Sequence, residues 1–169
     1  MVAGEDRMED APLGLEAHDH DRCVATALAA AETRCAAGRL RLTPVRRRAL
    51  EILLESHRAL GAYEVLDRLQ AEGLGAQPPA AYRALDFLVA NGFAHRVEKL
   101  NAYIACTHPG EAHVPAFLLC RACGAVGETV LAAPRGTLDR TALDAGFTVE
   151  KLVIEAEGLC QACAYEAEA

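Results

Sequence analysis

The chain has 169 residues, of which 52 % are apolar and 24 % charged, so it can fold as one domain or two small ones, and a wholly disordered protein is excluded. Its longest stretch without a charged side chain is shorter than the ~20 residues of a membrane-spanning helix, so we expect no membrane partner. The net charge of −7 hides an uneven distribution, because residues 39–105 hold ten basic and seven acidic side chains, a local charge of +3.

The first segment, residues 1–20, is acidic and lacks apolar periodicity, so we expect a flexible tail there. It has neither a basic start nor an apolar run, which predicts no export signal and a cytoplasmic location. The seven cysteines would then lie in a reducing compartment, where thiols bind metals or stay free more often than they form disulfides.

Residues 21–105 are predicted to form a winged helix-turn-helix domain. An Ala-rich run that stops at Gly38 indicates the first helix, and Thr43-Pro44 supplies a cap and a first turn for the second. β-Prone segments at the end indicate a hairpin, the wing. The expected elements are helices over 21–37, from Pro44, from Gly61 to Gly73 and over 78–92, and strands over 93–97 and 102–106.

The remainder is predicted to be a turn-rich hinge over 106–114 and a small α+β module over 115–169. The expected elements of this module are strands over 115–119 and 125–130, a helix over 134–145 and a last strand over 147–155. The fold class is therefore α+β.

The winged-helix prediction suggests that the basic middle of the chain binds DNA. The helix over 79–91 would enter the major groove, with its N-terminal residues towards the base edges, and Arg83 faces outward there. Two alternatives stay open: the arginines form a solvated helix face, or the winged helix binds only proteins. The candidates are Arg83 for a base contact, Tyr63 and Tyr82 for phosphate or base contacts, and Arg46, Arg47 and Arg48 for phosphate contacts.

Two CxxC motifs bracket most of the second module. Cysteines at this spacing on a tight turn can place both sulfurs on one ion, and two such turns complete a tetrahedral four-thiolate zinc site. A redox-active CxxC is the alternative, but two copies around one β-rich module favour structural zinc. A site with four protein ligands has no open position and catalyses nothing. Its residues are Cys120, Cys123, Cys160 and Cys163.

Further ligand-type residues lie around the domain junction, namely His95, Cys106, His108, His113 and Glu128. No fixed spacing among them identifies a site, and each alone is an ordinary wing, linker or surface residue. A zinc enzyme that uses three of them as ligands and Glu128 as base is an alternative. No His-x-Glu motif supports that enzyme.

Three segments carry a family resemblance: LTPVRRRALEILLESHRALGAYEVLDRL, PPAAYRALDFLVANGFAHRVEKLNAYIAC, and HVPAFLLCRACGAVGE followed by GLCQAC. Over roughly residues 20–163 they resemble the ferric uptake regulator superfamily of metal-sensing repressors, and most closely its zinc uptake regulator branch. The resemblance implies an N-terminal winged-helix domain, a hinge and a C-terminal α+β dimerisation domain. It also implies a homodimer that binds palindromic double-stranded operator DNA.

The resemblance further implies two zinc ions per subunit. It assigns structural zinc to Cys120, Cys123, Cys160 and Cys163, regulatory zinc to His95, Cys106, His113 and Glu128, and DNA contacts to Tyr63 and Arg83. The thiolate of Cys106 favours zinc over iron, since ferrous sensors of the superfamily use N and O donors. We therefore expect a zinc-dependent repressor of zinc-uptake genes and no enzyme, with an iron- or peroxide-responsive repressor as the alternative. Two departures are Ala81, where the family usually has Thr, and the additional imidazole of His108.

Overall fold

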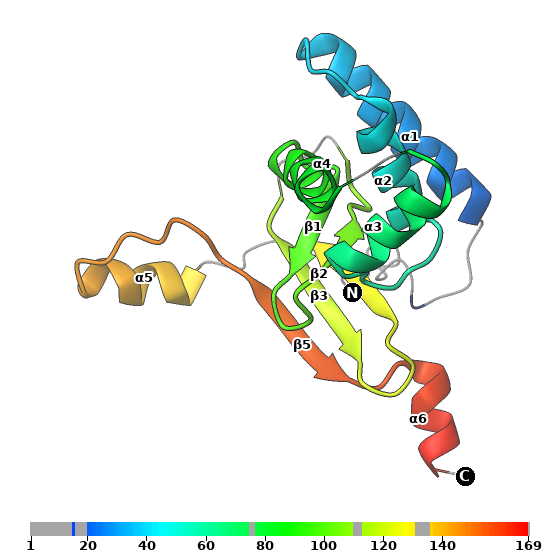
Figure 1. Ribbon diagram of the computed structural model, residues 1–169. Coiled ribbons are helices and arrows are strands. Elements are labelled where there is room, and N and C mark those ends of the chain that lie inside the picture. Colours follow the sequence, from blue (N-terminus) through cyan, green and yellow to red (C-terminus); the bar gives the residue numbers. More distant parts are fainter. Residues whose placement is uncertain (1–14, 16–19, 75–76, 110–112, 131–135, 169) are drawn as a thin grey trace, which may run out of the picture.

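The structure is a computed structural model that describes residues 15, 20–74, 77–109, 113–130 and 136–168 (Figure 1). The predicted tail therefore lies outside the described residues except for Leu15 and His20, and His20 already belongs to the first helix. No helix in the described part of the chain has the length and apolar character needed to cross a membrane.

The N-terminal half is a winged helix, as predicted. Helices α2 to α4 pack against one another, α1 lies along α2, and an antiparallel hairpin forms the wing (Figure 1). Its elements are α1 (His20–Ala37), α2 (Pro44–Leu54), α3 (Ala62–Ala71), α4 (Pro78–Ala90), β1 (Ala94–Val97) and β2 (Ala102–Ala105).

Local sequence explains where these helices begin. The hydroxyl of Thr43 accepts a hydrogen bond from the N–H of Arg46 at 3.4 Å, which caps α2 as predicted. The carboxylate of Glu64 accepts from the N–H of Gly61 at 2.7 Å and so secures the start of α3. Each helix then buries one apolar stripe in a common core, which includes Ala31, Leu53, Val65, Leu69, Leu85 and Leu88.

The C-terminal half is a three-stranded sheet with two helices. The strand order is β4-β3-β5, with β4 antiparallel and β5 parallel to β3. The connection from β4 to β5, which lie on opposite edges of the sheet, passes through α5, and this helix stands away from the sheet in Figure 1. The elements are β3 (Pro115–Cys120), β4 (Val126–Val130), α5 (Gly136–Asp144), β5 (Ile154–Gly158) and α6 (Gln161–Glu168).

The predicted last strand was wrong in position. Residues 147–153 are irregular, and the strand begins at Ile154 and ends at Gly158. Its register is set by pairing with β3, from Ala116 opposite Ile154 to Cys120 opposite Gly158, rather than by the apolar residues before it. Helix α6 was not predicted, and the predicted helix over 134–145 appears as α5, with 134 and 135 outside the described residues.

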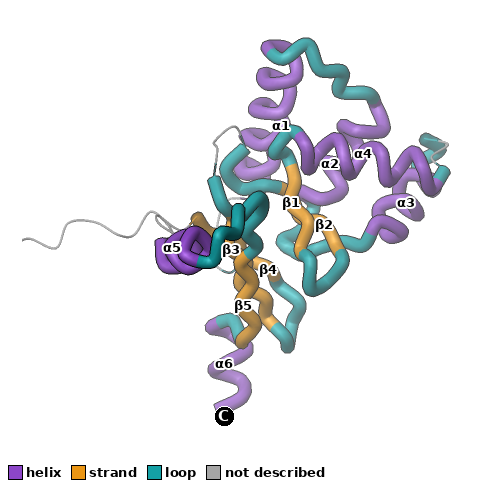
Figure 2. The backbone as a smooth tube through the Cα atoms, turned by 90° about the vertical axis from the view of Figure 1, so that its left-hand side faces the viewer, coloured by secondary structure: helices purple, strands orange, loops and turns teal. Residues whose placement is uncertain are grey.

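The wing is packed between the helices and the three-stranded sheet (Figure 2). A second apolar cluster joins the two halves, because Val97 and Ile104 of the wing contact Phe117, Leu119 and Val126 of the sheet. The turn after α2 adds a backbone contact, in which the N–H of Val126 donates to the carbonyl of His57 at 3.1 Å. The junction therefore has its own core.

Candidate metal centres and nucleic-acid interface

The four CxxC cysteines converge at one end of the sheet. Parallel pairing of β3 with β5 brings the chain after Gly158 to the turn after Cys120, so the two motifs meet. The sulfurs all lie within 4.8 Å of one another, and the Sγ atoms of Cys123 and Cys160 are 3.8 Å apart. A tetrahedron with ~2.3 Å zinc–sulfur bonds has edges of about 3.8 Å, so the cysteines fit zinc.

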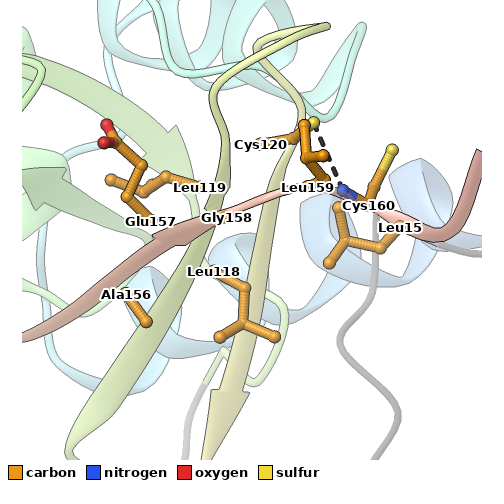
Figure 3. Close-up of a pocket in the computed structure, with 9 residues that line it drawn as sticks. All are labelled: Leu15, Leu118, Leu119, Cys120, Ala156, Glu157, Gly158, Leu159 and Cys160. Atoms are coloured by element: carbon orange, nitrogen blue, oxygen red, sulfur yellow. Dashed lines mark hydrogen bonds between the residues drawn. The ribbon is translucent and has the colours of Figure 1, made fainter. Parts of the chain in front are cut away.

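The local backbone prepares one of these sulfurs to bind as a thiolate. Backbone N–H groups of Cys123 and Cys160 point at the sulfur of Cys120 and lower its pKa to about 6. The N–H of Cys160 lies 3.3 Å from that sulfur. Figure 3 marks this hydrogen bond with a dashed line. Hydrogen bonding with Cys160 and burial raise the pKa of Cys163 to about 12, so without an ion the four sulfurs do not all ionise near neutral pH.

The junction residues form a second cluster. His95 lies on β1, Cys106 directly follows β2, His113 precedes β3, and Glu128 lies on β4. Their ligand atoms also lie within 4.8 Å of one another. Oε1 of Glu128 lies 3.0 Å from the Nε2 atoms of both His95 and His113. The same oxygen lies 4.0 Å from Sγ of Cys106. Two imidazoles, a thiol and a carboxylate directed at one point are a donor set that fits tetrahedral Zn²⁺.

Glu128 is almost fully buried, with a side chain that is 0 % exposed. Burial alone would raise its pKa, but the hydrogen bond and charge of His95 and two hydrogen bonds from Thr107 lower it to about 2. The N–H and hydroxyl of Thr107 donate to Oε2 at 2.7 and 2.9 Å. Sequence reasoning missed Thr107, although its position next to a candidate ligand, Cys106, was a signal.

His108 is not a member of this cluster. Its Nδ1 lies 3.0 Å from the hydroxyl of Thr107, and its ring stacks edge-on near His113. The cluster itself opens to a cavity of about 290 Å³, which His95 and His113 line together with residues 150–153. Two of the four candidate ligands therefore border this cavity, whereas Cys106 and Glu128 are buried behind it.

The candidate DNA-reading residues lie on adjacent helices. Tyr63 of α3 and Tyr82 of α4 meet edge to face with ring centroids 6.4 Å apart, and they are 63 % and 41 % exposed. Arg83 is exposed on the first turns of α4, and no hydrogen bond or ion pair engages it within the described chain. Large exposed aromatic rings beside an unneutralised guanidinium are suited to contact DNA.

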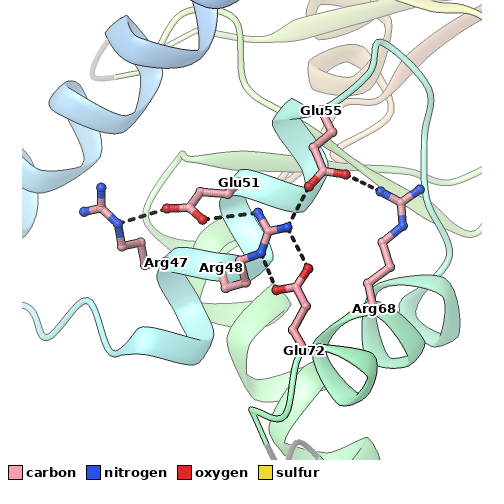
Figure 4. Close-up of polar contacts among 6 residues, drawn as sticks. All are labelled: Arg47, Arg48, Glu51, Glu55, Arg68 and Glu72. Carbon is pink, nitrogen blue, oxygen red and sulfur yellow. Dashed lines mark hydrogen bonds and ion pairs between the residues drawn. The ribbon is translucent and has the colours of Figure 1, made fainter.

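The arginine cluster on α2 has partners inside the protein. Arg48 forms ion pairs with Glu51, Glu55 and Glu72, and so joins α2 to α3 (Figure 4). Arg47 pairs with Glu51 and Glu32, and the guanidinium of Arg46 lies 3.8 Å from the ring centroid of Phe87. These contacts give the three arginines a structural role, so phosphate contacts from them stay a prediction.

Comparison with known proteins identifies the family. The chain is 41 % identical over 137 residues to the zinc uptake regulation protein of Escherichia coli strain K12, a match that covers 80 % of each chain. It is similar to the solved structure of a zinc uptake regulator complexed with zinc and DNA, with a TM-score of 0.82, 38 % identity and coverage of 86 % of this chain and 98 % of the other.

A second solved structure is that of holo XcZur, with a TM-score of 0.76 at 38 % identity, over 83 % of this chain and 98 % of that one. A scan against protein-family models finds no match. The identity to the curated relative and the share of each chain that it covers nevertheless show the family. The protein belongs to the zinc uptake regulator branch of the ferric uptake regulator superfamily.

Proposed function

We propose that the protein is a zinc-responsive transcriptional repressor of zinc-uptake genes. It acts in the cytoplasm as a homodimer that binds palindromic operator DNA when a regulatory zinc ion fixes the geometry between its two domains. Each subunit holds two zinc ions, a structural one at the four CxxC cysteines and a regulatory one at the junction cluster. The relatives support this proposal, since one is named a zinc uptake regulation protein and another is complexed with zinc and DNA.

The observation that carries the proposal is the meeting of ligands from the wing, from both ends of the predicted hinge over 106–114 and from the sheet. His95 and Cys106 come from the wing and its end, whereas His113 and Glu128 come from the sheet side. Zinc bound there would supply a tie between the wing and the sheet. The four side chains orient one donor atom each towards a common point.

This arrangement links metal to DNA through dimer geometry. A two-fold operator presents half-sites about one helical turn apart, ~34 Å, so two recognition helices must be held at that separation. A subunit whose wing and sheet are held together presents α4 in one orientation. Operator DNA selects this orientation, and linkage requires that DNA also tightens zinc binding.

The surface of the C-terminal half supports self-association. Leu138 and Leu143 of α5 and Phe147 after it are 46 %, 75 % and 65 % exposed, and β5 is an edge strand of its sheet. Exposed apolar side chains, and a strand edge that has no partner within the described residues, are typical of an interface between protein chains. A second copy of this chain is the partner that the family implies.

The decisive experiment measures DNA affinity against buffered free zinc. A duplex selected by the wild-type protein from a random-sequence pool is labelled, and its anisotropy is followed with and without chelator. Cys106→Ser should lose at least about tenfold of the zinc-stimulated affinity while the dimer stays folded. The control Thr33→Val changes an exposed residue of α1, whose hydroxyl donates only to the carbonyl of Ala29, and should keep the response. A zinc response unchanged in Cys106→Ser would overturn the proposal.

The alternatives have separate outcomes. An iron- or peroxide-responsive repressor would bind DNA with Fe²⁺ at free concentrations at which Zn²⁺ gives no response, and the buried thiol of Cys106 does not favour this metal preference. Membership of a family of uptake regulators confirms that the protein is not an enzyme.

A further inference from the structure

Thr107 holds one of the two oxygens of the buried carboxylate at the junction. Its N–H and its hydroxyl both donate to Oε2 of Glu128, at 2.7 and 2.9 Å. The other oxygen, Oε1, faces His95 and His113 at 3.0 Å each. The carboxylate therefore has one oxygen on the hinge side and one on the side of the ligand cluster.

A free glutamate can bind a metal ion through one oxygen or through both. Chelation by both oxygens of Glu128 would require Oε2 to leave two donors, one of which is a backbone N–H that cannot follow the side chain. The carboxylate of Glu128 is buried, so water does not replace the two donors of Thr107. The carboxylate is thus prepared to give one oxygen only.

We propose that Thr107 is a positioning residue that keeps Glu128 monodentate, so that the junction site offers four donor atoms and prefers Zn²⁺ over divalent ions that need more ligands. The inference rests on the proposed function, because it concerns the same site. Four ligands suit tetrahedral zinc, whereas Mn²⁺ and Fe²⁺ favour higher coordination with oxygen donors. Thr107 donates no electron pair to the ion and acts only through Glu128.

The position of Thr107 in the chain makes the effect specific. It follows Cys106 directly, so the segment that presents the thiol also holds the carboxylate of β4. Its hydroxyl oxygen is in turn 3.0 Å from Nδ1 of His108, which orients it. Outer partners of this kind change metal affinity by about 10- to 100-fold when they are removed.

The test uses the full-length dimer with its four-cysteine site loaded with zinc and the junction site empty. Thr107→Val removes the hydroxyl at nearly constant volume, Thr107→Ser keeps it, and Thr33→Val on α1 is a matched control far from the junction. Competition titrations give the affinities for Zn²⁺ and Mn²⁺. Co²⁺ reports the geometry, since its visible bands are intense in tetrahedral sites and weak in octahedral ones.

In Thr107→Val we expect zinc affinity to fall by about 10- to 100-fold, the ratio of Zn²⁺ to Mn²⁺ affinity to fall by at least about tenfold, and the visible cobalt bands to weaken. Thr107→Ser and Thr33→Val should match the wild type. An unchanged metal ratio and unchanged cobalt bands in Thr107→Val would overturn the inference, as would failure of Thr107→Ser to restore them.

The same spectra separate this inference from the proposed function. Binding of Co²⁺ by the thiolate of Cys106 gives a charge-transfer band, which Cys106→Ser must abolish. If the wild type shows no band that depends on Cys106, the regulatory site itself is wrongly assigned. If that band is present but Thr107→Val changes neither geometry nor selectivity, the site stands and only the role of Thr107 is refuted.

Discussion

The tip of the wing is fastened to the sheet by a contact that needs no metal. Glu155 of β5 accepts hydrogen bonds from the backbone N–H groups of Glu98 and Lys99 at 2.6 and 2.9 Å. Two ion pairs flank it, from Lys151 to Glu98 at 2.6 Å and from Lys99 to Glu157 at 2.8 Å. We name these five residues the wing latch. The latch stabilises the same relative position of wing and sheet that the junction cluster requires.

Glu155→Ala removes the centre of the wing latch. Each hydrogen bond from an N–H to a carboxylate contributes about 1.5–3 kcal/mol when shielded, but water replaces part of this at the exposed wing tip, which leaves about 1–2 kcal/mol for the pair. The ratio of latched to unlatched protein then falls about 5- to 30-fold. Zinc binds the latched form, so the free zinc at half-maximal DNA binding should rise by up to this factor.

The assay follows anisotropy of a labelled operator duplex over a series of buffered zinc concentrations. At saturating zinc, the affinity of Glu155→Ala for DNA should differ from wild type by less than about threefold, because the four ligands hold the wing in place. The control Glu157→Ala removes only an ion pair between exposed side chains, worth about 0.5 kcal/mol or about twofold in the midpoint. A midpoint that does not move in Glu155→Ala refutes the reasoning.

Three further variants probe other parts of the molecule. Arg83→Ala should weaken operator binding about 10- to 100-fold through loss of a base contact, with zinc binding unchanged in a competition titration. Arg48→Gln should lower the free energy of unfolding in urea by about 1–2 kcal/mol, since it breaks the ion pair with Glu72 that joins α2 to α3 and the ion pair with Glu55 at the end of α2. Lower DNA affinity with a shallower salt dependence at unchanged stability would make Arg48 a phosphate ligand instead. The pKa of Glu128 is about 2 against an ordinary 4.5, so its charge stabilises the fold above about pH 4.5 and this contribution is lost as the pH falls towards 2. The difference in free energy of unfolding between wild type and Glu128→Gln should shrink over that range, and a difference independent of pH would contradict this.

Features coded by neighbouring residues could be predicted from the sequence. Each CxxC motif indicated two sulfurs for one ion, and Thr43-Pro44 marked the start of α2, because in both cases the signal is complete within a few residues. The ion pairs of the arginine cluster were also within reach. Glu51 follows Arg47 by four residues on one helix face, a spacing that predicts a salt bridge, but a count of charges in the segment conceals it.

Features that depend on tertiary pairing could not be predicted from spacing. His95 and Glu128 are separated by 33 residues and meet only because the wing packs on the sheet. The final strand was misplaced because its pairing with β3 fixes its register, and the apolar residues before it stay outside the sheet. The wing latch depends on the same packing, since Glu155 lies 57 residues after the backbone group at Glu98 that it accepts from.

The apolar contacts at the junction limit what the metal switch can be. Val97 and Val126 are fully buried there, and Phe117 nearly so, so separating the wing from the sheet would expose side chains that each contribute about 1.5–3 kcal/mol when buried. If the winged-helix domain separated from the sheet on loss of zinc, both the apolar contacts and the wing latch would be broken, and the free energy of both would be lost. A small rotation about the apolar cluster would keep most of these contacts. In the proposed dimer such a rotation would change the separation of the two recognition helices, which has to match the half-sites of the operator. The two orientations then differ little in free energy. A zinc affinity that is a hundredfold higher for one orientation, which corresponds to about 2.7 kcal/mol, is enough to turn that orientation from the minor into the major form.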